Sequence, residues 1–142
     1  MAKDTLIIMC SGIGFIQKVL EFIHQDLKLA DTDYDLLAVP GGAHSLGITA
    51  FLPKFRWALE HWIKFLVQEH QIKRVIIIDH KNCAWFDKLA ISDPEFIGRA
   101  QSHWSGNLSD YFAFFSVYRP DMNIEAWQAE NVGDLVQFKK VN

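Results

Sequence analysis

The run Val75, Ile76, Ile77 and Ile78 is the feature that most constrains how this chain folds. All four side chains are β-branched, which favours a strand over a helix. Residues 5–9 and 36–39 form two more short apolar runs. The run at residues 5–9 is continuous, which suggests a strand buried on both faces. The sequence therefore predicts a sheet that other elements cover on both sides.

Helical segments separate the predicted strands. Apolar residues recur at helical spacing in residues 15–27, 52–66 and 108–118. Residues 124–129 alternate between apolar and polar, as a fourth strand would, and a turn at Gly133 leads into a short apolar run. Strands that alternate with helices predict an α/β fold with a mostly parallel β-sheet and helices on both faces.

The composition limits the possible classes of function. The chain fits a single α/β domain over residues 1–142. A formal net charge of −3, without a cluster of Lys or Arg, argues against a nucleic-acid partner. We see no secretion signal, and charged residues interrupt the most apolar helical stretch, so we expect a cytoplasmic protein with no membrane span. Two cysteines in such a chain suggest buried thiols, a metal site or a redox pair rather than a disulfide scaffold.

Both cysteines follow predicted strands. Cys10 comes after residues 5–9, and His80 and Cys83 lie together after the strand at residues 75–78. Because the carboxyl ends of parallel strands meet at one edge of a sheet, we expect these three side chains to converge on one metal ion. Two thiolates and an imidazole suit zinc, and an open fourth position is typical of catalytic zinc. Two alternatives stay open: the cysteines are small buried residues, or they form a disulfide or redox pair.

Residues 5–86 resemble the β-class carbonic anhydrases in the order and spacing of three loops. In that family the first strand ends in Cys-x-Asp-x-Arg, the second precedes a glycine-containing turn, and the third ends in Gly-His-x-x-Cys. Here Cys10, residues 40–42, and the pair His80 and Cys83 stand at the matching positions. The resemblance implies zinc bound by Cys10, His80 and Cys83. It also implies a homodimer or larger homo-oligomer.

The chain departs from the family pattern around these loops. Residues 12–14 replace the aspartate and arginine that, in the family, form a pair that orients or replaces the zinc-bound water. We name two candidate catalytic residues in their place. His44 would orient a water molecule, the alternative being an exposed loop histidine. Asp79 would accept a hydrogen bond from a zinc ligand or be a fourth ligand, the alternative being a residue that caps the loop.

Three functions are compatible with these residues. The first is a zinc-dependent lyase or hydrolase that uses zinc-bound hydroxide on carbon dioxide or a similar small-molecule substrate. The second is a catalytically inactive carbonic-anhydrase-like protein that keeps its metal site for stability or ligand binding. The third is a thiol redox protein that uses Cys10 and Cys83.

The chain is rich in tryptophan. Aromatic residues at helical spacing usually lie in the core, and this is the first interpretation of Trp57 and Trp62. Together with Trp85, Phe86 and Trp104, they also suit a dry pocket or a subunit contact, since aromatic residues are enriched at interfaces.

Overall fold

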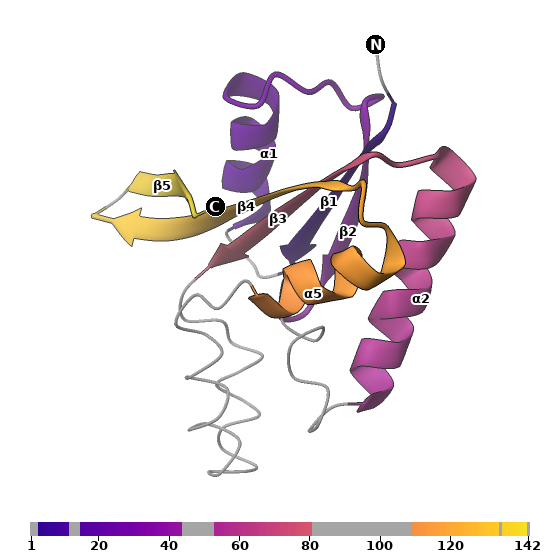
Figure 1. Cartoon of the computed structure of the whole chain (residues 1–142). Helices are drawn as coiled ribbons and strands as arrows, with labels where there is room; N and C mark the ends of the chain where they lie inside the picture. The colour runs from indigo at the N-terminus through magenta and orange to yellow at the C-terminus, as the bar shows by residue number, and fades with distance from the viewer. Residues whose placement is uncertain (1–2, 12–14, 44–52, 81–108, 134, 142) are drawn as a thin grey trace, which may run out of the picture.

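The computed structural model describes residues 3–11, 15–43, 53–80, 109–133 and 135–141. These residues form a five-stranded sheet in the order β2-β1-β3-β4-β5, with helices packed on it (Figure 1). In chain order the elements are β1 (Thr5–Cys10), α1 (Ile16–Gln25), β2 (Tyr34–Val39), α2 (Pro53–His70), β3 (Arg74–His80), α5 (Ser109–Tyr118), β4 (Asn123–Val132) and β5 (Leu135–Lys140). Strands β1 to β4 pair in parallel, and β5 is antiparallel to β4. The predicted α/β fold with a mostly parallel sheet is therefore confirmed.

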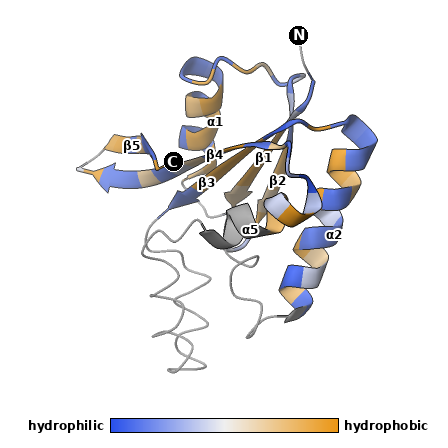
Figure 2. Cartoon of the chain, in the orientation of Figure 1, coloured by the Kyte–Doolittle hydropathy of each residue, from blue (hydrophilic) through white to orange (hydrophobic). Residues whose placement is uncertain are grey.

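The core has two halves because β1 and β3 send alternate side chains to opposite faces of the sheet. On one face Ile7 and Ile76 pack against α1, which buries Phe22 there. On the other face Leu6 and Ile77 pack against residues of α2 and α5. Figure 2 shows hydrophobic residues gathered on the central strands, between the helices. Helices thus cover both faces, as the uninterrupted apolar runs predicted.

Several strands extend further than the sequence predicted, among them β1 and β3. Cys10 is the last residue of β1, and both Asp79 and His80 belong to β3. The pairing of β3 with β4 continues to the last two residues of β3, where Asp79 lies opposite Gln128 and His80 opposite Ala129. The prediction that Asp79 and His80 lie in a loop was therefore wrong, because the neighbouring strand extends the hydrogen-bonded ladder over these polar residues.

Helix α2 buries a narrower stripe than its aromatic content suggested. Leu59 and Ile63, which are four residues apart, are 1% and 0% exposed and face the sheet. By contrast Phe55, Trp57 and Trp62 are 45%, 64% and 49% exposed. The interpretation of Trp57 and Trp62 as core residues was therefore wrong. Neither α2 nor any other helix in the described part of the chain has the length and apolar character needed to cross a membrane.

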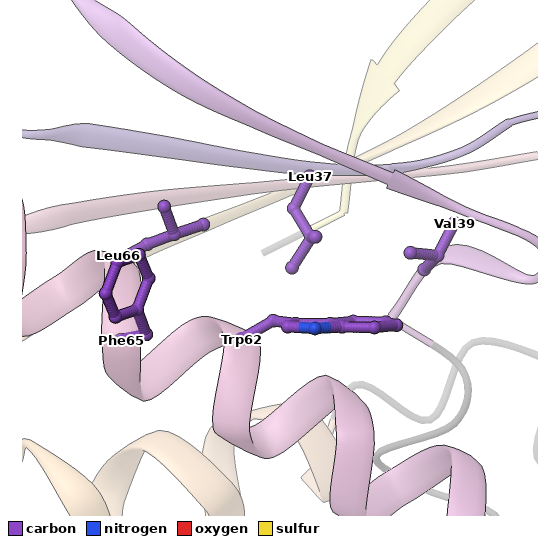
Figure 3. Close-up of a pocket in the computed structure, with 5 residues that line it drawn as sticks. All are labelled: Leu37, Val39, Trp62, Phe65 and Leu66. Carbon is purple, nitrogen blue, oxygen red and sulfur yellow. The ribbon is translucent and has the colours of Figure 1, made fainter.

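An apolar pocket of about 250 Å³ lies between β2 and α2. It is lined by Leu37, Val39, Trp62, Phe65 and Leu66 (Figure 3). In the close-up, Leu37 and Val39 point from β2 toward the indole of Trp62. Because β2 is the last strand on this side of the sheet, its outer edge has no strand partner among the residues that the structure describes. This side of the molecule therefore combines exposed aromatic surface with a strand edge that no described strand pairs.

The end of α2 is joined to the start of β2 by a hydrogen-bonded ion pair between His70 and Asp35. The hydrogen bond to Asp35, followed by the attraction of its charge, raises the pKa of His70 above its ordinary value of 6.5. A raised pKa in the folded protein means that protonated His70 stabilises the fold. This contribution is fully present below pH 6.5 and is lost as the pH rises through the raised pKa.

We expect His70→Gln to reduce the free energy of unfolding more at acidic pH than at alkaline pH. Urea denaturation of wild type and variant across this range would measure the difference. Asp35→Asn is the matched control, since it removes the partner and should abolish the same pH dependence. A difference between wild type and His70→Gln that stays constant with pH would contradict the assignment.

Candidate metal centre

Cys10 ends β1, the strand that lies between β2 and β3. It pairs with Val39 of β2, and the next amide, that of Ser11, donates a hydrogen bond to the carbonyl of Val39 at 3.2 Å. The side chain of Cys10 is 8% exposed. Pairing with β2 therefore holds the backbone that carries this thiol, both at Cys10 and at the residue after it.

His80 reaches the same edge of the sheet from the neighbouring strand. Met9 lies opposite Ile78 in the last pair of the parallel ladder between β1 and β3, so Cys10 and His80 follow this pair by one and two residues. Oδ1 of Asp79 and Nε2 of His80 are both buried from solvent. The structure thus brings Cys10, Asp79 and His80 to the carboxyl ends of two adjacent parallel strands, where α/β proteins commonly bind ligands.

Because side chains alternate along a strand, Cys10 and His80 lie on opposite faces of the sheet. Leu6 and Ile8 belong to the core under α2 and α5, and Cys10 continues their side of β1. Ile76 and Ile78 belong to the core under α1, and His80 continues that side of β3. One ion shared by Cys10 and His80 would therefore have to lie beyond the tips of the strands rather than on either face.

Phe15, just before α1, packs against the imidazole of His80. The two ring centroids are 4.6 Å apart, with 30° between the ring planes. Phe15 also contacts the core under α1, which confirms that His80 lies on this face. Sequence reasoning missed this contact, because Phe15 was interpreted only as part of the apolar stripe of a helix.

The turn after β2 reaches back to the end of β1. Gly41 and Gly42 have φ values of 80° and 55°, in the left-handed region that favours glycine. A Cβ atom on Gly42 would lie 3.1 Å from the backbone nitrogen of Cys10. The sequence signalled the turn through its two glycines, but not the close approach to Cys10.

Several predicted residues lie outside the described part of the chain, namely the zinc ligand Cys83, the candidate His44, and the aromatic residues Trp85, Phe86 and Trp104. Within residues 3–11, 15–43, 53–80, 109–133 and 135–141, no three His, Cys, Asp or Glu side chains are grouped as a metal site requires. The donors that are described fit zinc chemically, since a buried thiol and an imidazole are both zinc ligands. The three-residue ligand set and the roles of Asp79 and His44 stay predictions.

Comparison with known proteins supports the fold rather than a family. No protein-family model matches the chain. An uncharacterised protein of Rickettsia bellii (strain RML369-C) is 30% identical over 86 residues, which are 61% of this chain and 51% of that protein. The chain therefore spans about half the length of the curated relative it matches.

Two solved structures resemble the whole chain. Carbonic anhydrase from Streptococcus mutans superposes with a TM-score of 0.58 at 12% identity, covering 100% of this chain and 86% of that one. A β-carbonic anhydrase of the fungal pathogen Aspergillus fumigatus gives a TM-score of 0.52 at 14% identity, covering 96% and 74%. The chain thus has the fold of the β-carbonic anhydrases, and at such low identity the likeness shows the fold alone.

The contact between Phe15 and His80 predicts a specific spectroscopic signature. A benzene ring over an imidazole shifts the imidazole protons upfield, so Phe15→Leu should move the His80 ring resonances downfield in metal-free protein. Phe138→Leu is the matched control, because it removes an aromatic ring that stacks on Phe22 on the same face of the sheet. NMR of selectively labelled histidine would measure both variants. Equal shifts of the His80 signals in the two variants would contradict the contact.

Proposed function

We propose that this protein binds zinc through Cys10, His80 and Cys83 and acts on carbon dioxide or a similar small, neutral substrate. The observation that carries the proposal is the position of Cys10 and His80 at the ends of adjacent strands in a sheet with the fold of β-carbonic anhydrases. Cys83 follows His80 by three residues, a spacing found in zinc sites. Bound zinc with an open position would lower the pKa of a coordinated water to about 7.

Residues of the chain would bind the metal, orient its ligands and exclude water from the site. Burial of Cys10 and of Nε2 of His80 would limit competition from solvent for the metal. Asp79, beside His80, is the described residue best placed to accept a hydrogen bond from a ligand, an interaction that commonly orients zinc-binding groups. We propose His44 as a second polar group at this site, in place of the aspartate and arginine that residues 12–14 lack.

A second candidate is a carbonic-anhydrase-like protein that binds zinc without catalysis. The replacement of the aspartate and arginine by residues 12–14 favours it. This candidate predicts bound zinc and a melting temperature that falls on chelation, but no hydration of carbon dioxide. The thiol redox alternative would instead need Cys10 and Cys83 to oxidise together, with the loss of two hydrogen atoms.

Zinc content separates these functions. We expect wild type to retain zinc, and Cys10→Ser, Cys83→Ser and His80→Ala each to lower zinc affinity by more than about 100-fold, the upper range for residues that only support a ligand. His24→Ala is the matched control, since His24 pairs with Asp31 near the other end of α1. Metal analysis and competition with a chromophoric chelator would measure these changes.

Two further measurements, together with the zinc content, distinguish the three candidate functions. Stopped-flow hydration of carbon dioxide by the zinc-loaded protein would distinguish an enzyme from an inactive relative. Intact-mass measurement without reductant would detect oxidation of the two thiols. Wild type that carries no zinc, with an oxidised Cys10 and Cys83, would exclude both metal functions and favour the redox protein.

We also propose that the protein forms a homodimer or larger homo-oligomer. The support is the α2 aromatic surface, which we define as Trp57, Trp62 and Phe65. Trp57 and Phe65 are 64% and 62% exposed, and large apolar side chains clustered on a surface are typical of an interface. The outer edge of β2, which no described strand pairs, lies beside Trp62 and Phe65 and would gain hydrogen bonds from a second copy.

Substitution of this surface tests the assembly. The double variant Trp62→Gln and Phe65→Gln should weaken self-association at least about 30-fold, since a central aromatic contact contributes roughly 2 kcal/mol or more. Val117→Gln is the control, because Val117 is 89% exposed on α5, outside the α2 aromatic surface. Light scattering across a dilution series would report the mass. A monomeric wild type, or equal dissociation of both variants, would contradict this interface.

A further inference from the structure

Gly42 lies in the turn that follows β2, and it is buried against the end of β1. An ideal Cβ atom at this position would be 3.1 Å from the backbone nitrogen of Cys10 and 3.2 Å from the carbonyl carbon of Met9. Such distances are shorter than about nine in ten Cβ contacts in proteins, so a side chain here would require the β1 backbone to give by a few tenths of an ångström. The missing side chain therefore lets two backbones approach closely.

The close approach is separate from the requirement for a left-handed backbone. Gly133, between β4 and β5, has a φ of 62°, similar to the 55° of Gly42. A Cβ atom on Gly133 would meet nothing within 4 Å. Both positions favour glycine because of their φ angle, but only at Gly42 would the added atom press on a neighbouring strand.

The neighbours of Gly42 fix the turn in place. Ala43 is fully buried in the core under α2 and α5. On the other side, Val39 pairs with Cys10 and accepts the hydrogen bond of the Ser11 amide. The turn is thus held at both ends and has little freedom to move away from β1, so an atom added at Gly42 would press directly on the backbone of Cys10.

We infer that Gly42 is a positioning residue for Cys10, because it seats the turn after β2 on the peptide between Met9 and Cys10 and so fixes where the thiol projects. The inference rests on the proposed function insofar as Cys10 is a zinc ligand. Zinc–ligand distances are held to within about 0.2 Å, which is comparable to the displacement that a Cβ atom at residue 42 would cause. Gly42 therefore affects the metal site without touching the metal.

The test compares Gly42→Ala with Gly133→Ala. Both substitutions impose a left-handed φ on alanine, so both should destabilise the fold, and Gly42→Ala should do so more because its Cβ also meets the β1 backbone. Only Gly42→Ala should weaken zinc binding, by about 10-fold or more, as residues that support a ligand commonly do. Competition with a chromophoric chelator gives the zinc affinity, and urea denaturation gives the stability.

A second readout does not depend on zinc. In metal-free protein with Cys83→Ala, iodoacetamide reacts with Cys10 as the sole thiol, since the chain has two cysteines. Gly42→Ala should change the alkylation rate of Cys10, whereas Gly133→Ala at matched stability should leave it as it is. If Gly42→Ala does not fold, the pair Gly42→Asn and Gly133→Asn replaces it, because asparagine adopts the left-handed conformation more readily and still adds a Cβ atom.

The two readouts separate this inference from the proposed function. A wild type that binds no zinc overturns the metal function, while the alkylation rates still decide the role of Gly42. Equal changes of alkylation rate in the Gly42 and Gly133 variants overturn the positioning role, even if wild type binds zinc. A selective effect on both alkylation and zinc affinity supports the inference.

Discussion

The hydrogen bonding of β1 on both sides is the constraint on which the rest of the structure depends. β1 pairs in parallel with β2 and with β3, and its residues Leu6 to Met9 are at most 1% exposed. A strand buried this completely needs a partner for every backbone group and a cover on each face. The chain moves from β1 outward to β2 and then returns past β1 to β3, so right-handed crossovers put α1 and α2 on opposite faces.

The same topology creates the candidate metal centre. The connection from β1 leads to β2 on one side of it, and the connection from β2 leads to β3 on the other side. Open α/β sheets bind ligands where the strand order reverses in this way, beyond the carboxyl ends of the strands. Cys10 and His80 end the two strands that meet there. Contacts from outside these strands hold both residues: the turn at Gly42 lies against the backbone of Cys10, and the ring of Phe15 packs on His80.

Sequence reasoning was most accurate where the signal came from a few neighbouring residues. The apolar run at residues 5–9 predicted a strand buried on both faces, and every residue of β1 is buried. It was least accurate where a distant element decides. Trp62 lies next to Ile63 in a helix of aromatic and aliphatic residues, and only the direction from which the sheet meets α2 makes one exposed and the other buried. Likewise β4, more than forty residues later in the chain, extends β3 to include Asp79 and His80.

The sequence by itself determined the alternation of strands and helices, the parallel sheet, and the edge of the sheet at which Cys10 and His80 lie. Backbone propensity and the period of apolar residues are properties of neighbours in the chain, so they can be read without a structure. Only the tertiary structure decided which face of α2 is exposed, how far β3 extends, and that Gly42 and Phe15 support Cys10 and His80. Those features depend on contacts between segments far apart in sequence, whose distances no local pattern specifies.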